Sequence, residues 1–241
     1  MAIPTFKNEP LTDFNKPADR KAMESALARV KKMLGKEYPI VIGGEEIYTE
    51  NKFSSTNPSR PSEVVGVFQK ADAGLADKAV ETAAAKFEDW KWVEPKKRAD
   101  HLFKAAKIMR KRKHEFSAVM VYEVGKTWPE ADADTAEAID FMEFYAREML
   151  RYAGKQPVTK MPGEKNEVVY IPLGVGVIVP PWNFALAILT GMSSAAIVAG
   201  NTIVLKPSSD SPMTGWMYFN LMREVGVPAG VINFVSGPGG S

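Results

Sequence analysis

The sequence predicts an α/β protein in which a parallel βαβαβ sheet follows a helical layer and a small antiparallel sheet. Two observations predict the parallel sheet. The stretches "GVGVIVP", "TIVLKP" and "GVINFV" are apolar at nearly every position, as expected of parallel strands covered on both faces. Two stretches of helical length, "FALAILTGMSSAAIVAG" and "SPMTGWMYFNLMREVG", separate them. This alternation favours right-handed crossovers between neighbouring strands.

The chain before this region opens with a helix and then a small sheet. Residues 17–34 place apolar side chains at helical spacing, and Gly35 follows as a stop signal. In "YPIVIGGEEIYTE" the pair Gly43-Gly44 separates two short β-rich runs, which indicates a hairpin. The later run "EVVGVFQ" predicts another strand, and we expect it to form a small antiparallel sheet with the hairpin.

Three helical stretches follow and predict a helical layer. They cover residues 73–89, 95–124 and 129–152, and the second is expected to break near His114. The start signals are Asp72, Thr127 and Pro129, and the stop signals are Gly125 and Gly154.

A connecting segment, "GKQPVTKMPGEKNEVVYIP", joins this layer to the parallel strands. Within it "VTK" and "EVVYI" are expected to pair as a protruding hairpin around Pro162-Gly163, and "VVYIP" reads as an apolar strand. The exposed edge of such an arm invites pairing with a second chain. We place a domain boundary between residues 1–165, which hold the helices, the small sheet and the start of the arm, and residues 166–241.

Composition excludes several classes of function. The net charge of +2 over 241 residues gives no general attraction for nucleic acid. The amino terminus lacks a signal-peptide pattern and no apolar run reaches 18 residues, so no membrane association and a cytoplasmic location are expected. The absence of cysteine excludes disulfides, thiolate metal sites and a thiol nucleophile within these residues.

Two charged stretches are interpreted as solvated faces. The basic stretch is "KIMRKRKHE" and the acidic stretch is "EADADTAEAIDFME", which includes Asp132, Asp134, Glu137, Asp140 and Glu143. With only two histidines in the chain, no metal site is expected. Glu137 is retained as the acidic residue that is a candidate for a role at the site.

Candidate site residues lie at the carboxyl ends of the predicted strands, where open parallel sheets bind ligands. After the first strand, Pro180 and Pro181 end strand pairing, and Asn183 either caps the next helix or points into the crevice. After the second strand, Lys206 is either a solvated lysine or a holder of ribose or phosphate. The glycine-rich "SGPGGS" after the third strand is either a close approach for a nucleotide or an ordinary turn.

The motifs "VPPWNFALAI" and "GNTIVLKPSSDSP" resemble those of the aldehyde dehydrogenase superfamily in both order and spacing. The resemblance covers almost the whole chain. Segments such as "VYEVGK", "EAIDFMEFYARE" and "GEKNEVVYIPLGVGVIVPPWNF" look closest to the bacterial Δ1-pyrroline-5-carboxylate dehydrogenases within it. It implies a truncated form of that fold, with an incomplete Rossmann-like sheet as the first half of a dinucleotide-binding domain.

The resemblance also implies roles for individual residues. Asn183 is expected to supply the oxyanion-hole amide, and Phe184 to flank the aldehyde tunnel, with Glu137 on the substrate side. Lys206 and Ser209 are expected to hold the adenosine ribose of NAD or NADP. Many NAD-preferring relatives carry glutamate at the position of Ser209, so dual cofactor use is expected. The expected lining of the cofactor crevice is Ile178, Val179, Pro180, Pro181, Trp182 and Gly239.

The expected function is the oxidation of L-glutamate 5-semialdehyde to glutamate with NAD(P)+, in proline breakdown, by a longer parent protein. The nucleophilic cysteine and general-base glutamate of the family would lie beyond residue 241, so the chain is expected to be an amino-terminal half without activity of its own. The alternatives are an inactive nucleotide-binding or assembly module, and a parent acting on another aldehyde. The expected partners are a small aldehyde and either a second copy of the chain or the complementary half.

Overall fold

The computed structural model describes residues 4–239, which form seven helices and eight strands. The helices are α1 (Pro17–Lys31), α2 (Ala73–Trp90), α3 (Pro95–Lys111), α4 (Lys113–Val124), α5 (Trp128–Ala153), α6 (Ala187–Val198) and α7 (Pro212–Glu224). The strands are β1 (Lys36–Tyr38), β2 (Ile40–Ile42), β3 (Glu45–Ile47), β4 (Lys52–Asn57), β5 (Arg60–Gln69), β6 (Val175–Ile178), β7 (Thr202–Leu205) and β8 (Ile232–Phe234).

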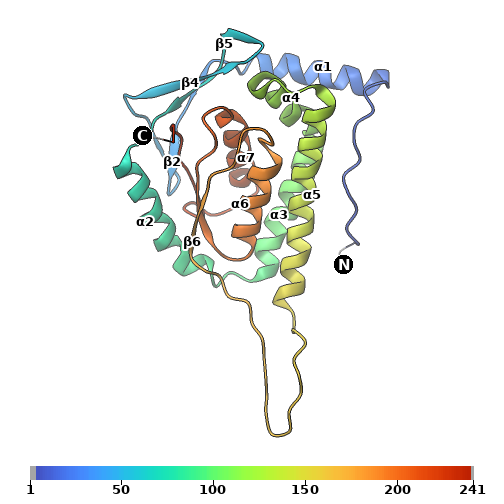
Figure 1. Ribbon diagram of the computed structural model, residues 1–241, viewed down its shortest axis with the longest axis vertical. Coiled ribbons are helices and arrows are strands. Elements are labelled where there is room, and N and C mark those ends of the chain that lie inside the picture. The colour runs from blue at the N-terminus through green and yellow to red at the C-terminus, as the bar shows by residue number, and fades with distance from the viewer. Residues whose placement is uncertain (1–3, 240–241) are drawn as a thin grey trace.

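The main sheet has five strands in the order β3-β2-β8-β7-β6, and β6, β7 and β8 run parallel. Helices α6 and α7 lie on one side of it and α2 on the other (Figure 1). Every residue of β7 and β8 is buried, which explains their predominantly apolar pattern. The predicted βαβαβ unit is therefore confirmed.

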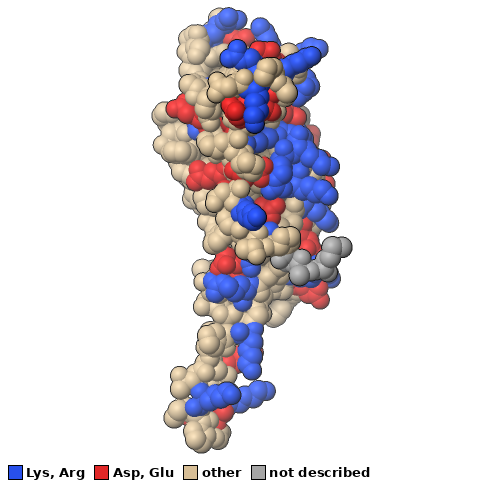
Figure 2. Space-filling view, turned by 90° about the vertical axis from the view of Figure 1, so that its right-hand side faces the viewer, with Lys and Arg blue, Asp and Glu red and all other residues tan. Residues whose placement is uncertain are grey.

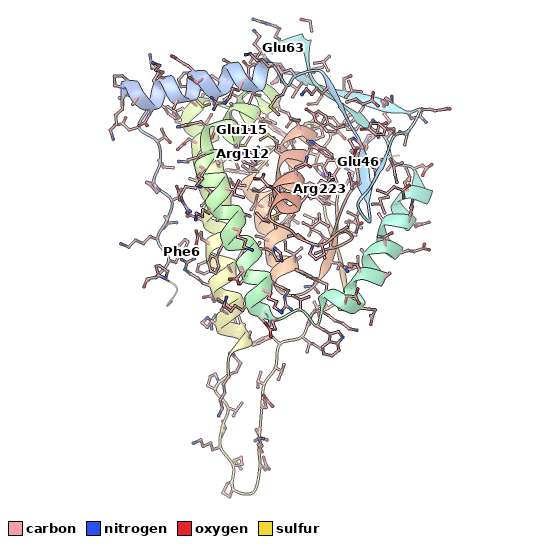
Figure 3. All side chains as sticks on the ribbon, turned by 180° about the vertical axis from the view of Figure 1, so that it is seen from behind. Phe6, Glu46, Glu63, Arg112, Glu115 and Arg223 are labelled. Atoms are coloured by element: carbon pink, nitrogen blue, oxygen red, sulfur yellow. The ribbon has the colours of Figure 1, made fainter. Side chains whose placement is uncertain are left out.

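The strands near the amino terminus divide between two sheets, which corrects the prediction of one small antiparallel sheet. The Gly43-Gly44 hairpin forms as predicted, but its strand β2 pairs with β8 and so extends the main sheet. The small sheet has the order β1-β5-β4, and β1 is parallel to β5. The local pattern identifies the hairpin, whereas its partner β8 lies almost at the other end of the chain. On the back of the molecule, Arg223 of α7 reaches Glu46 of β3 at 3.4 Å (Figure 3).

The helical layer matches the prediction closely. The Asp72 side chain accepts a hydrogen bond from the Leu75 amide at 2.9 Å, and Thr127 forms a capping box with Glu130. Gly125 ends α4 with a φ of 67°, a left-handed conformation that favours glycine. The break between α3 and α4 falls at Arg112, two residues before His114. Helix α5 packs against α3, α4 and α6.

The prediction that the acidic and basic stretches form solvated faces is wrong for three of their residues, Asp132, Asp134 and Lys113. Asp132 and Asp134 of α5 are buried, and they pair with Lys113 at 2.9 Å and Lys126 at 2.5 Å. These carboxylates lie between packed helices, and buried charges persist in proteins when they are paired. Lys107 and Lys111 are exposed as predicted. Figure 2 shows basic side chains gathered in a band on the body with acidic ones beside them.

The connecting segment forms a protruding arm, residues 154–171, but no strand pairing occurs within it (Figure 1). The predicted turn is present at Pro162-Gly163, where Gly163 has a φ of 79°. The strand expected at "VVYIP" is absent from the described structure, in which β6 begins at Val175. An isolated two-stranded ribbon is marginally stable without a face to pack on. The division of domains between residues 165 and 166 stays a prediction, and the pairing of β2 with β8 crosses it.

Candidate functional site

The loops that follow β6 and β7 meet at one edge of the main sheet. Ile178 and Leu205 are partners in register at the ends of these strands, and the Lys206 amide donates to the Ile178 carbonyl at 2.9 Å. The Val235 amide donates in turn to the Leu205 carbonyl at 2.9 Å. The three strand ends that the sequence singles out are therefore adjacent.

The segment after β6 forms a wall that alternates between core and surface. Ile178 and Pro180 are buried, whereas Val179 and Pro181 are exposed. Trp182 is also exposed, and its ring is available at the rim of the site. Because neither proline has an amide hydrogen to donate, the chain leaves the sheet here in a stiff conformation.

Asn183 lies in the turn before α6, and its side chain makes no hydrogen bond with any residue from 4 to 239. Helix α6 begins at Ala187, whose amide donates to Asp134 Oδ1 at 2.6 Å. The alternative in which Asn183 serves only as a helix cap is therefore wrong. Its exposed amide group remains available to a ligand.

Phe184, the next residue, is 46% exposed, and its ring centroid lies 5.0 Å from Lys126 Nζ. The same ammonium group pairs with Asp134. The turn that carries Asn183 and Phe184 thus contacts two charged side chains of the helical layer.

The segment after β7 presents a cation and a hydroxyl group. Lys206 is half-buried, and burial lowers its pKa. Within residues 4–239 its Nζ has one polar contact, the Pro207 carbonyl at 3.4 Å, and no carboxylate partner. Ser209 Oγ donates to the Gly237 carbonyl at 3.2 Å, which joins this segment to the glycine-rich turn after β8. A half-buried cation without a carboxylate partner suits an anionic or hydroxylated ligand.

Trp182 and Ser209 line a common cavity of about 410 Å³. Glu123 of α4 also lines this cavity and is fully buried. It accepts hydrogen bonds from the Met213 and Thr214 amides at 2.6 and 2.7 Å, and from the Ser55 hydroxyl at 3.2 Å. Burial raises the pKa of Glu123 to about 7, although these hydrogen bonds oppose the shift. The start of α7 is therefore occupied by a carboxylate from another helix.

The end of the chain adds little to the site. Gly239 is exposed, and a β-carbon there would meet no atom within 4 Å. The last two residues of "SGPGGS" lie outside the described residues. The residues present fit a dinucleotide through Lys206, Ser209 and the wall at Trp182. The starts of α6 and α7 are both taken by carboxylates, so neither is free to bind phosphate.

Glu137 is not brought into the cavity that holds Trp182 and Ser209. It lies on the exposed side of α5 in a smaller hollow that Phe6 and Phe144 also line; Figure 3 marks Phe6 beside the helix. Burial raises the pKa of Glu137, and the carboxylates of Asp134 and Asp140 raise it further. Asp134 lies about one helical turn from Glu137 along α5, and Asp134 also contacts the start of α6, directly after the turn at Phe184.

Three side chains that support the site were not identified from the sequence. Asp134 and Lys126 contact the turn after β6, and Glu123 holds the start of α7. No sequence signal marks them, because their contacts join residues that lie far apart along the chain. The sequence rules for helix caps apply only to a side chain about three residues from the amide that it accepts from.

Between residues 4 and 239, no group of three or more histidine or acidic residues is arranged to hold a metal ion. In the same part of the chain, none of the helices combines the length and apolarity needed to cross a lipid bilayer.

The sequence profile of the aldehyde dehydrogenase family matches residues 47–241. A 1-pyrroline-5-carboxylate dehydrogenase of Anoxybacillus flavithermus is 52% identical over 98% of this chain and 46% of its own length. The chain thus spans about half the length of the curated relatives it matches.

Solved structures show the same relationship. The 1-pyrroline-5-carboxylate dehydrogenase from Thermus with bound NAD has a TM-score of 0.95 and 46% identity, over 100% of this chain and 47% of that one. Proline utilization A from Bdellovibrio bacteriovorus, inactivated by N-propargylglycine, has a TM-score of 0.96 and 42% identity, over 99% of this chain and 25% of that one.

Proposed function

Because this chain belongs to the aldehyde dehydrogenase family, we propose that it is the oxyanion- and cofactor-binding part of an enzyme that oxidises L-glutamate 5-semialdehyde. This aldehyde is the open form of pyrroline-5-carboxylate, and its product is L-glutamate. The names of the relatives at 52% identity support this substrate, and an NAD-bound relative supports an NAD-type cofactor.

Asn183 carries the proposal. Its side-chain amide is exposed at the carboxyl end of β6 and free of protein hydrogen bonds within residues 4–239. In that position its NH2 group donates to the aldehyde oxygen as negative charge develops there. Loss of one such donor typically costs about 3 kcal/mol of transition-state stabilisation.

The cofactor side of the site is formed by the ends of β6 and β7. The wall from Ile178 to Trp182 packs against the dinucleotide, and Lys206 and Ser209 bind its adenosine ribose. When bound, NAD or NADP accepts the hydride of the aldehyde carbon. Ser209 is uncharged, so it does not repel a 2′-phosphate as a carboxylate would, and use of both cofactors follows.

The substrate side is formed by Phe184 and Glu137. The exposed ring of Phe184 flanks the aldehyde chain, directly beside the proposed oxyanion donor. Glu137 offers a carboxylate, which is complementary to the α-ammonium group of glutamate semialdehyde. A parent enzyme that acts on another aldehyde is the alternative, and it makes no use of Glu137.

The chain has no cysteine, so the covalent step needs a nucleophile from a complementary segment. In that step a thiolate of the complementary segment would add to the aldehyde carbonyl, the bound cofactor would act as the hydride acceptor, and water would hydrolyse the resulting thioester to the acid. The same observation favours a second candidate function for the chain by itself. Alone, it is a nucleotide-binding or assembly module without turnover.

The test replaces Asn183 in the complete enzyme. We expect Asn183→Ala to lower kcat for glutamate semialdehyde by about 100- to 1,000-fold while the KM for NAD stays nearly constant. Asn220→Ala on α7 is the control, since Asn220 contacts the Trp216 carbonyl and lies outside the proposed site. An Asn183→Ala enzyme with the kcat of the control would exclude the oxyanion role.

A further inference from the structure

Helix α6 starts without a cap of its own. Leu186 occupies the N-cap position, and its side chain cannot accept a hydrogen bond. The Ala187 amide instead donates to Asp134 Oδ1 at 2.6 Å, from a helix 53 residues earlier in the chain. The Asp134 side chain is 1% exposed, so this contact is shielded from water.

The second oxygen of Asp134 is held by Lys126. The distance from Lys126 Nζ to Asp134 Oδ2 is 2.5 Å, and the Lys126 side chain is 13% exposed. The same Nζ lies 5.0 Å from the centroid of the Phe184 ring, in cation–π geometry. Lys126 therefore contacts the turn at residues 183–186 and also neutralises the carboxylate that caps the helix after it.

These contacts hold the turn at two points, and the exposed Asn183 directly precedes the first of them. Phe184 is held by Lys126, and Ala187 is held by Asp134. Ala185 and Leu186 between them are fully buried, whereas Asn183 is exposed. The direction of the Asn183 side chain thus depends on where the turn is anchored, because Asn183 has no hydrogen bond of its own within the described residues.

We propose that Asp134 and Lys126 are positioning residues that hold the turn at residues 183–186 and thereby aim the Asn183 amide. Neither residue is proposed to touch the aldehyde. The inference rests on the proposed function for its chemical consequence, but the anchoring itself is independent of any ligand. Because Asp134 caps α6, Asn183 does not serve as the cap of this helix, although its position in the sequence suggests that role.

Helix α5 supplies a matched control pair. Asp132 lies two residues before Asp134, its side chain is also 1% exposed, and it pairs with Lys113 at 2.9 Å. Its carboxylate accepts hydrogen bonds from Thr12 rather than from α6. Substitutions in the two pairs therefore disturb similar buried ion pairs whose carboxylates lie on one helix, and only one pair contacts the turn.

The first experiment measures hydrogen exchange in the chain without ligand. We expect Asp134→Asn and Lys126→Met to speed exchange of the amides at residues 184–188 by about tenfold or more relative to wild type. Asp132→Asn and Lys113→Met should leave these amides within about twofold, even where they lower global stability. Lys126→Arg keeps both the charge and the ring contact and should restore slow exchange. Equal exchange of residues 184–188 in both sets of variants would overturn the proposal.

The second experiment measures steady-state kinetics in the complete enzyme. Lys126→Met should lower kcat by about tenfold or more with the KM for NAD within about twofold, and Lys126→Arg should recover most of the loss. A KM effect without a kcat effect would show that the pair does not act through Asn183. If exchange behaves as expected but Asn183→Ala is fully active, the anchoring stands and the proposed function fails.

Discussion

Asn183 is available for chemistry because other residues satisfy the backbone around it. Asp134 caps α6 and Glu123 caps α7, and both are buried on the helical layer rather than placed next to the helices they cap. Each of these helices begins directly after a strand-end loop that the sequence selects as ligand-binding. The residues proposed to contact ligand, such as Asn183 and Lys206, are therefore free of structural hydrogen bonds to carboxylates within the described chain.

Cofactor choice should depend on position 209. Ser209→Glu places a carboxylate where the 2′-phosphate of NADP is proposed to lie, and also an acceptor for the 2′-hydroxyl of NAD. Two unit charges about 4 Å apart interact by roughly 1 kcal/mol at the dielectric constant of water, and by roughly 4 kcal/mol at the effective dielectric constant near a protein surface. The ratio of NADP to NAD efficiency, measured as kcat/KM in the complete enzyme, should therefore fall by about tenfold or more.

Two comparisons make this test specific. Ser208→Glu adds the same charge one residue away, where the hydroxyl accepts from the Asp210 amide, and it should change the ratio much less. Lys206→Ala should weaken both cofactors, and NADP more. An unchanged ratio in Ser209→Glu would show that Ser209 does not face the ribose.

Glu123 should make stability depend on pH. Its pKa is raised from 4.5 to about 7, chiefly by burial. The folded state then keeps a proton that the unfolded state has lost, so the free energy of unfolding falls as pH rises from 4.5 to about 7. The loss is on the order of 3 kcal/mol. In denaturant titrations across this pH range, the free energy of unfolding of wild type should fall as pH rises, whereas that of Glu123→Gln should not show this fall.

The control for this slope is Glu130, which lies in the capping box of α5. Hydrogen bonds from Thr127 lower its pKa, so its contribution is present above its ordinary pKa and is lost at more acid pH. Glu130→Gln should therefore keep the slope between pH 4.5 and 7. Parallel pH profiles for wild type and Glu123→Gln would exclude Glu123 as its source.

The arm at residues 154–171 carries several exposed apolar side chains. Val169, Tyr170 and Ile171 are 67%, 58% and 75% exposed and follow one another directly. They are β-forming residues without a strand partner in the described structure. Figure 2 shows basic side chains at several levels of the arm, with a few acidic ones and uncharged surface between them.

We predict that the arm mediates assembly, either with a second copy of the chain or with a complementary segment. Val169→Asp combined with Ile171→Asp should abolish self-association in sedimentation equilibrium, because charges on an exposed edge oppose strand pairing. Val80→Asp on α2 is the control, since Val80 is an exposed apolar residue outside the arm. A wild-type chain that stays monomeric at high concentration and binds no complementary segment would contradict the prediction.

Within the described residues, the main sheet of the molecule has an open edge at β6. Strand β6 pairs with β7 on one side, and within residues 4–239 no strand pairs with its other side. Val177 in this strand is 59% exposed. In doubly wound sheets of the order 3-2-1-4, the fourth strand pairs with the first. In the order β8-β7-β6, the unpaired edge of β6 is therefore the position at which a strand from a complementary segment would pair.

We predict that residues 1–241 alone do not oxidise aldehydes. The chain contains no cysteine, and covalent aldehyde oxidation requires a nucleophile. NADH formation from glutamate semialdehyde should stay at the level of a sample without protein, while the complete enzyme gives turnover under the same conditions. Turnover that persists through repurification of the chain would refute the prediction.

Local patterns in the sequence were sufficient to predict most of the elements and the three strand ends at the site. Predominantly apolar runs predicted β6, β7 and β8, and Thr127 and Gly125 marked helix ends correctly, because these signals act over one turn or one strand. Tertiary structure alone decided that β2 joins β8, that Asp132 and Asp134 are buried, and that the arm does not pair with itself. It also decided that Asp134 caps α6 in place of Asn183. These outcomes depend on partners that lie far apart along the chain, and local patterns carry no information about which distant partner satisfies a strand edge, a carboxylate or a helix start.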